Sequence, residues 1–317
     1  MSNSWPTGEM GDLVIATGQT AQFPAGAVYD YSSITVEVGA TLEILPGVGW
    51  TIFGVSGDLN LRGSLVDRGH EHFGGSWTRT APDNQPLSAT LPQGDGGAGG
   101  NYLGCGNGQG VAQYMGRGGS PSAHPTQGNG GGGGTISTNG DGGNGGAASG
   151  GNGATPSNPP GEFGSGGVGG SGFSANGQDG GSVFSGDTNF NHVAGGGGGG
   201  TRGRHGGLLY LCVLGKFDAS GGAIDLSGEA GGSGGKGGSA ARGGGAAGGG
   251  GGAGGDGGVL VLRYKTGFAP PIFKVNSGSA GSGGAGGVNH FYPSYVACPG
   301  KNGQNGTEGR LDIAQIL

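Results

Sequence analysis

The chain has 317 residues, a formal net charge of −6 and 92 glycines. Lys and Arg are scattered singly, so no basic stripe could neutralise nucleic-acid phosphates. No apolar run approaches the roughly 20 residues of a membrane span. The sequence therefore predicts no nucleic-acid binding and no membrane insertion. Residues 1–6 have neither the basic nor the apolar region of a signal peptide, which predicts synthesis in a cytoplasm without general secretion.

The glycine content by itself is typical of disorder, because Gly and Pro together exceed the roughly 25–30 % that marks low complexity. Collagen is excluded because the triplet register breaks repeatedly, for example at residues 239–242. Charged residues make up only 11 % of the chain, whereas disordered chains usually carry many. Ordered glycine segments are therefore favoured over solvated disorder, which stays open as an alternative.

The three cysteines, Cys105, Cys212 and Cys298, are far apart and form no CxxC pair. This spacing argues against a disulfide scaffold or a zinc site. Cys212 lies inside an apolar run, which predicts a small buried residue. No cofactor is expected.

Residues 12–66 have the period-two alternation of half-buried strands, with glycines marking the turns. The strand spacing predicts a β-sandwich or a short β-solenoid. No segment has convincing helical periodicity, so an all-β chain with almost no α-helix is expected. The apolar side of these strands comprises Ile34, Val36, Val38, Leu42, Ile44, Trp50, Ile52, Leu59, Leu61 and Leu65.

The chain is predicted to divide into an N-terminal β domain for attachment, residues 1–93, and a glycine-rich domain, residues 94–317. Residues 67–93 of the first domain are expected to be a polar connection. In the second domain, glycine tracts run directly into apolar strands. The expected tracts are 94–207, 228–258 and 278–287, and the expected strands are 208–214, 259–264, 272–275 and 310–317. The similar segments 217–221 and 223–228 are expected to be successive rungs.

Glycine tracts can be ordered if their backbones hydrogen-bond sideways. A polyproline II helix has three residues per turn and no internal hydrogen bonds, so every N–H and C=O points outward. Without side chains, neighbouring helices can approach and satisfy these groups. Ser233, Lys236 and Ser239 follow this period among glycines. The sequence therefore predicts a polyglycine II helix bundle anchored on the β base.

This combination resembles the tip adhesins of T-even-type bacteriophage long tail fibres, in which glycine-rich segments form a polyglycine II sandwich joined by variable loops. The resemblance rests on the three glycine tracts and their alternation with less glycine-rich segments. It implies a virion protein without enzymatic activity that binds a host cell-surface protein or glycan through its loops. It also implies contact with other virion proteins of the fibre, tail or capsid.

On this resemblance, the aromatic interruptions of the glycine tracts are candidate receptor-binding residues. Aromatic side chains give rigid contact area at low entropic cost. The alternative is that they cap the bundle or pack on the β base. The candidates are Tyr102, Tyr114, Phe163, Phe173, Phe184, Phe190, Phe291, Tyr292 and Tyr295.

Other motifs give weaker indications. Residues 251–256 match the start of a GGxGxD calcium repeat, but no tandem copy follows, so no calcium site is expected. His70 and His72 are expected to lie in a solvated loop. Glu37 and Glu43 are expected to face away from the apolar side of their strands, and stacked rungs could pair them as in a glycosidase. The β segment lacks a long repeated groove, so an enzyme is not expected.

Three further functions stay open. The chain could be a capsid decoration or head-fibre protein with a purely structural role. It could be an ice-binding protein, since some of these use polyglycine II bundles, although a secretion signal is not seen. It could also be a flexible low-complexity protein.

Overall fold

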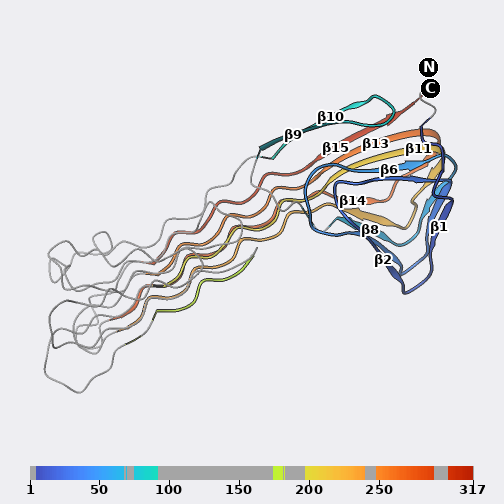
Figure 1. The fold of residues 1–317 in the computed structure, drawn as a ribbon. Coiled ribbons are helices and arrows are strands. Elements are labelled where there is room, and N and C mark those ends of the chain that lie inside the picture. The colour runs from blue at the N-terminus through green and yellow to red at the C-terminus, as the bar shows by residue number, and fades with distance from the viewer. Residues whose placement is uncertain are drawn as a thin grey trace, which may run out of the picture.

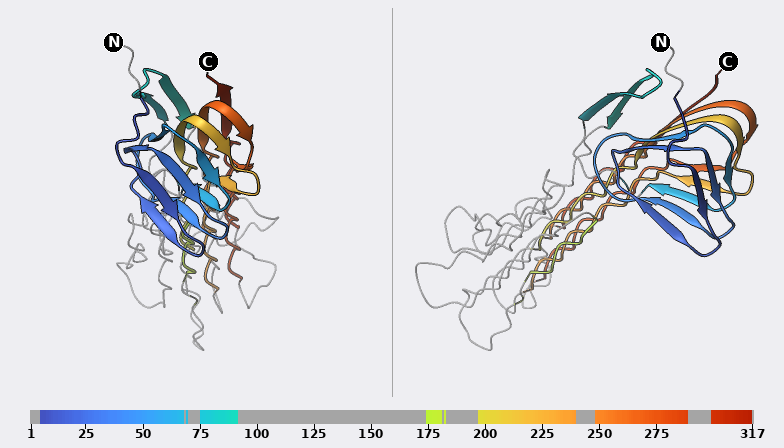
Figure 2. Two further views of the ribbon diagram at one scale, coloured as in Figure 1. Left: turned by 90° about the vertical axis from the view of Figure 1, so that its right-hand side faces the viewer. Right: turned by 45° about the vertical axis from the view of Figure 1, so that its right-hand side comes forward.

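The computed structural model describes residues 5–67, 69, 75–91, 174–180, 182, 197–239, 248–288 and 299–316. A β-stranded base lies at one end, and the described glycine-rich segments extend from it side by side (Figures 1 and 2). The elements of this described part are all strands, and none is a helix. The expectation of an all-β chain is confirmed for these residues.

The base is built from two parallel sheets. Hydrophobic β-branched and aliphatic residues dominate the strands, as is usual in parallel sheets with buried faces. The first sheet contains β1 (Asp12–Ile15), β3 (Val28–Tyr31), β4 (Ser33–Val36), β6 (Thr51–Val55), β7 (Leu59–Leu61), β11 (Leu208–Asp218), β13 (Val259–Ala269) and β15 (Arg310–Gln315). The second contains β2 (Thr20–Phe23), β5 (Thr41–Ile44), β8 (Ser64–Asp67), β12 (Ala223–Asp225) and β14 (Ile272–Lys274).

The chain alternates between the two sheets, and each alternation stacks on the previous one. In the second sheet, for example, Leu42 pairs with Ala21 on one side and Leu65 on the other. We call one passage through both sheets a rung. A complete passage through the first sheet has a leading half, such as β3 or β6, and a trailing half, such as β4 or β7. The long strand β11 supplies both halves, because it pairs with β6 and then with β7.

The main hydrophobic core lies between the two sheets. Ile34, Phe53 and Leu211 from the first sheet and Leu42 and Ile224 from the second belong to it, and each is at most 1 % exposed. Inward residues recur at alternate positions of every rung, so the period-two pattern of the sequence places them correctly. Three residues are exceptions. Val38 follows β4 in a turn, where it is 68 % exposed. Trp50 and Ile52 belong to a second cluster on the outer face of the first sheet and not to the main core. The expected place of these three residues with the other apolar residues is therefore wrong.

Residues 67–93 are not the polar connection that the sequence suggested. They contain an antiparallel hairpin of β9 (Gly75–Thr80) and β10 (Pro86–Leu91). The alternation in β10 buries Leu87, Ala89 and Leu91 in a second cluster. In the same cluster are Trp50, Ile52, Leu208, Tyr210, Cys212, Val259 and Val261. The hairpin therefore covers the outer face of the first sheet, and Cys212 is buried as expected.

The strands expected after position 200 are present as β11, β13, β14 and β15. They join the same two sheets as the strands before position 93, and β11 pairs directly with β6. The similar segments 217–221 and 223–228 are not successive rungs, because the first contains the end of β11 in the first sheet and the second contains β12 of the second sheet. Their likeness reflects a common turn, in which Asp218 accepts from the N–H of Ser220 and Asp225 from that of Ser227.

Candidate functional site

The glycine-rich segments occupy one recurring connection of the base. In the early rungs this connection, from a second-sheet strand to the next first-sheet strand, is short: residues 24–27 and 45–50. In the later rungs it comprises residues 226–258 between β12 and β13 and residues 275–309 between β14 and β15. Because equivalent connections leave the stack at the same side, the glycine segments lie together (Figure 1).

Six described glycine-rich segments extend from the base, and we call them together the projection. Residues 228–239 and 276–288 lead away from the base, and residues 197–207, 248–258 and 299–309 lead back to it. Residues 174–180 run parallel to 228–239, because Gly177 and Gly180 donate to the carbonyls of Ser233 and Lys236. We call these the outgoing and returning segments. The outgoing segments 228–239 and 276–288 follow strands of the second sheet, and the returning segments lead into strands of the first.

Backbone hydrogen bonds link the segments at every third residue. Gly228, Gly231, Gly234 and Gly237 donate to the outgoing segment 276–288. The residues one position further along, such as Gly232 and Gly235, donate instead to the returning segment 197–207, with N···O distances of 2.7 and 2.8 Å. Three residues per turn is the period of a polyproline II helix. The backbone N–H groups of these glycines are therefore satisfied laterally.

Close backbone contact explains why these positions are glycine. A Cβ on Gly252 would overlap the carbonyl oxygen of Thr201, and one on Gly281 would overlap that of Gly232. The remaining position of each triplet, such as that of Lys236, can carry a side chain. Gly232 and Gly235 are buried while Lys236 is exposed, which agrees with the period-three pattern seen in the sequence.

Polar side chains complete the hydrogen bonding at the two lateral edges of the projection. Asn176 and Asp179 accept from the N–H groups of Ser233 and Lys236 at one edge. At the other edge, Asn302 and Asn305 accept from neighbouring backbone N–H groups at 2.9 and 2.8 Å. These side chains replace the backbone carbonyls that a further segment would supply.

The last returning segment is not recognisable from glycine density, because only every third residue of 299–309 is glycine. Its signal is Gly300, Gly303, Gly306 and Gly309, separated by polar pairs. The glycines face the neighbouring segments, donating for example from Gly303 to Gly281. The polar residues between them are exposed. Triplet spacing, and not glycine density, was the informative feature.

A buried polar chain lies at the root of the projection. His205 and Asp256 are 1 % and 4 % exposed in their side chains, and Nδ1 lies 2.9 Å from Oδ2. Arg202 contacts Nε2 of the same imidazole. The backbone N–H of Asp256 donates to Nδ1 at 3.0 Å. Asp256 also accepts from the N–H and hydroxyl of Thr307.

This chain ties three returning segments together, because its members come from residues 197–207, 248–258 and 299–309. Burial raises the pKa of Asp256, but hydrogen bonds from His205 and Thr307 outweigh it and the net pKa is lowered. The aspartate of the partial calcium motif is therefore used inside the fold. Among the described residues, no group of three potential metal ligands is present.

A second buried carboxyl, Asp67, is the last residue of β8, where the chain leaves the base for residues 68–207 before it returns as β11. Its side chain lies against Gly207, and Oδ1 accepts from the N–H of Gly69 at 3.0 Å. Burial raises its pKa to about 7, and the Gly69 hydrogen bond opposes this only partly. At this position a protonated carboxyl is the stable form at mildly acidic pH.

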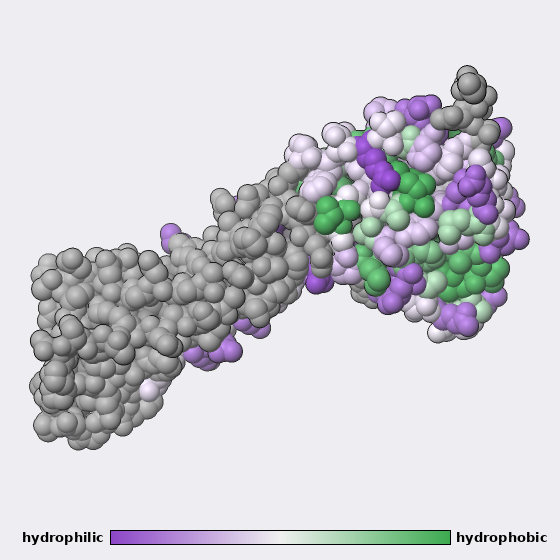
Figure 3. All heavy atoms as spheres, viewed as in Figure 1, coloured by the Kyte–Doolittle hydropathy of each residue, from purple (hydrophilic) through white to green (hydrophobic). Residues whose placement is uncertain are grey.

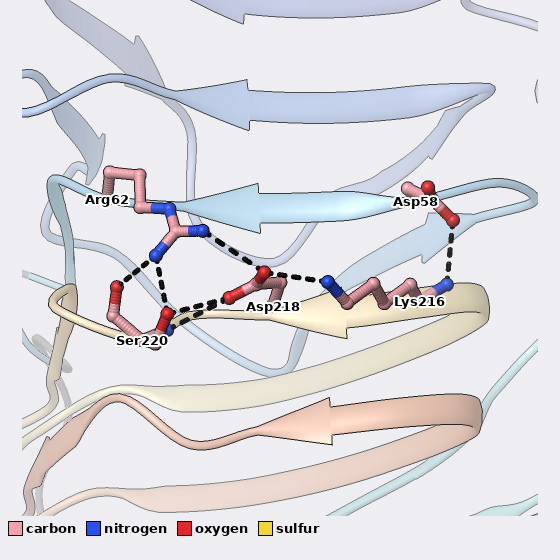
Figure 4. Close-up of polar contacts among 5 residues, drawn as sticks. All are labelled: Asp58, Arg62, Lys216, Asp218 and Ser220. Atoms are coloured by element: carbon pink, nitrogen blue, oxygen red, sulfur yellow. Dashed lines mark hydrogen bonds and ion pairs between the residues drawn. The ribbon is translucent and has the colours of Figure 1, made fainter.

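Figure 4 shows a polar cluster on the base around Asp218. The carboxylate accepts from Lys216 Nζ at 2.9 Å, from the Ser220 hydroxyl at 2.9 Å and from Arg62 at 3.1 Å. The hydrogen bond from Lys216, followed by those from Ser220, lowers its pKa to about 2. Arg62 follows β7 and Asp218 ends β11, so the cluster links two rungs and holds Asp218 ionised.

The structure does not bring Glu37 and Glu43 together. Glu37 is half exposed and accepts from Thr17 at 2.8 Å, beside the first sheet. Glu43 lies on β5 of the second sheet, accepts from Gln22 at 2.7 Å and is 9 % exposed. Leu42 and Ile44 on either side of it belong to the main core, so Glu43 faces away from the apolar side as expected, although it is buried. The two glutamates lie on different sheets, and the glycosidase-like pair is not formed.

The nine candidate aromatic residues all lie outside the described residues, as do His70 and His72. Their covalent positions are nevertheless informative. Residues 183–196, with Phe184 and Phe190, join an outgoing segment to a returning one. Residues 289–298, with Phe291, Tyr292 and Tyr295, do the same. Tyr102, Tyr114, Phe163 and Phe173 lie between the hairpin and the first described outgoing segment.

Comparison with known proteins gave no match to a family model, a curated protein or a solved structure. Within the described part of the chain, no helix is long and apolar enough to cross a membrane.

Proposed function

We propose that the six glycine segments form a polyglycine II bundle on a short β-solenoid base. The support is the threefold recurrence of lateral hydrogen bonds and the absence of room for a Cβ at the bonded glycines. Slow amide exchange at Gly232, Gly235 and Gly252 would agree with this arrangement. Exchange at random-coil rates in the folded protein would refute it, since these amides would then be open to water.

We further propose that the chain is a bacteriophage virion protein that binds a host-surface receptor, as a tail-fibre or tail-tip adhesin. The observation that carries this proposal is the direction of the segments. Each outgoing segment leaves the base and each returning segment comes back, so residues 183–196, 240–247 and 289–298 connect ends remote from the base. A projection held by its own backbone would present such connections on a rigid support.

The receptor-contacting residues would be the aromatic side chains of these connections, above all Phe291, Tyr292 and Tyr295. The proposed receptor is a cell-surface protein or glycan. The base would attach the protein to another virion protein of the fibre, tail or capsid. The proposal includes no catalytic step.

Immunogold labelling of the virions that carry this chain tests its place. Label at fibre ends or the tail tip supports the adhesin. Label on capsids overturns it in favour of the second candidate, a capsid decoration or head-fibre protein, for which the same projection would be structural.

Adsorption tests the contact residues. Replacing Tyr292 and Tyr295 with alanine should reduce adsorption of the virion to its host by on the order of tenfold or more, since aromatic anchors dominate many interfaces. Val38→Ala is the matched control, because Val38 is exposed on the base. Unchanged adsorption of the double variant, or equal loss in the control, would contradict the assignment.

A further inference from the structure

The stack of rungs in the base is open at both ends. In the part of the chain that the structure describes, the first sheet ends at β1 on one side and β15 on the other, and the second sheet ends at β2 and β14. Unpaired edges of this kind are templates for pairing with another chain.

The two end rungs are incomplete in complementary ways. At one end, β15 pairs with residues 259–264 of β13, so it fills only the leading half of its rung. The trailing half beside residues 265–269, and the place beside β14, have no further strand among the described residues. At the other end, β1 occupies a trailing half, since it pairs with β4, and β2 follows in the second sheet. The β1–β2 end therefore supplies a trailing half and a second-sheet strand, which are the parts that the β14–β15 end lacks.

Exposed apolar side chains gather at these ends. Ile272 is 64 % exposed, Leu311 40 % and Phe268 36 % at the β14–β15 end. Val14 on β1 is 60 % exposed at the opposite end, where Met10 and Val28 are also exposed. Figure 3 shows hydrophobic surface between polar residues on one face of the base. Only two other large hydrophobic residues of the described part, Val38 and Val48, are this exposed.

The inward positions of the ladder are apolar up to both open edges. One column runs through Leu13, Ile34, Leu59, Phe217 and Phe268. If the stack continued by one rung, Phe268 of one copy would lie beside Leu13 of another. In the second sheet, the column Ala21, Leu42, Leu65, Ile224 and Phe273 would likewise continue from Phe273 to Ala21.

We propose that this surface binds a second copy of the chain, stacked head to tail so that the two incomplete rungs form one complete rung. Strand β1 of one copy pairs with residues 265–269 of the other, and its β2 pairs with the other's β14. The leading half of the shared rung is β15, which takes the place beside β3 now held by residues 7–11. In that segment Glu9 makes a bridge to Tyr31, and the N–H of Met10 donates to the carbonyl of Asp30. Thr7 and Gly8 donate to the Asp30 carboxylate, and Gly11 accepts from Ser32. Stacking therefore displaces this segment from β3.

The register of this contact is specific. In the second sheet, neighbouring strands place five residues in one column, in the order Gln22, Glu43, Val66, Asp225 and Lys274. Continuing the column places Gln22 of one copy beside Lys274 of the other. Such a contact uses different surfaces on the two copies, so it can repeat without closing. It would align the projections of neighbouring copies in one direction, and it does not depend on the identity of any receptor.

A mixed crosslinking experiment tests the register. Gln22→Cys and Lys274→Cys proteins are prepared separately, mixed, oxidised mildly and separated without reductant. The mixture should give a dimer band well above that of each variant alone and of wild-type protein, which measure background from the native cysteines. A mixture of Val38→Cys with Lys274→Cys is the control. A band no stronger than in the control would overturn the proposal.

Sedimentation tests the surface independently. Wild-type protein should associate with rising concentration, and Ile272→Asp should weaken that association by on the order of tenfold or more, because burying an unpaired charge is unfavourable. Val38→Asp is the control, since Val38 is similarly exposed in a turn. Circular dichroism checks that both variants fold. A monomeric wild type, or equal loss in both variants, would refute the contact.

Discussion

Gly252→Ala is the sharpest test of lateral backbone packing. Gly252 donates to Gly232 at 2.8 Å and accepts from Gly281 at 2.8 Å. An added Cβ would lie well inside 3.0 Å of the Thr201 carbonyl oxygen, which itself accepts from Gly232 at 2.7 Å. The obstacle is backbone, so no side chain can rotate away, and two segments must separate.

The expected loss of stability follows from these contacts. Overpacking in a tight interior typically costs about 1–3 kcal/mol. Weakening two lateral hydrogen bonds adds about 1–3 kcal/mol. The lower entropy of alanine in the unfolded chain offsets about 0.4–1 kcal/mol. Gly252→Ala should therefore lower the free energy of unfolding by about 2–5 kcal/mol.

Denaturant unfolding measures the global loss, and amide exchange at Gly232 and Gly281 measures local opening. Ser279→Ala is the matched control, because Ser279 is exposed on a neighbouring segment and its hydroxyl makes no hydrogen bond within the described part of the chain. The control should change stability by less than about 0.5 kcal/mol. If Gly252→Ala is as stable and as protected as Ser279→Ala, the segments do not pack as described.

Three further outcomes are expected. The pKa of Asp67 rises from 3.8 in the unfolded chain to about 7 in the folded protein. Its contribution to the free energy of unfolding is therefore complete below about pH 4 and is lost as the pH rises through 7. At 1.36 kcal/mol per pKa unit, the contribution lost is about 4 kcal/mol. Asp67→Asn should flatten that slope in denaturant unfolding across pH 4–9, and an unchanged slope would contradict the assignment. Asp256→Asn removes the charge between His205 and Thr307 and should cost about 3 kcal/mol, with faster amide exchange at Thr307; protection equal to wild type would argue against the buried chain. Leu87→Ala, at a 2 % exposed position of the hairpin, should cost about 2–5 kcal/mol in thermal unfolding, and a loss below about 0.5 kcal/mol would show that the hairpin does not pack on the sheet.

Local sequence patterns determined which segments are strands and which face each strand buries. Alternation places Ile34, Leu42 and Leu61 in the core, because strand side chains point to opposite faces with period two. Triplet spacing of glycine similarly determines which backbone faces can touch, as at Ser233 and Lys236. These features depend only on the residues nearest in the chain.

Tertiary structure decided which segments become neighbours. Leu211 pairs with Phe53 although more than a hundred residues separate them, and no local pattern specifies that pairing. The root of the projection, where His205 meets Asp256 and Thr307, exists only because three returning segments are aligned by the strands that follow them. The hairpin was missed for the same reason, since Leu87 gains its burial from the face of a distant sheet. Burial and lateral hydrogen bonds depend on the distance in space between groups, and the stacking order of the rungs sets that distance.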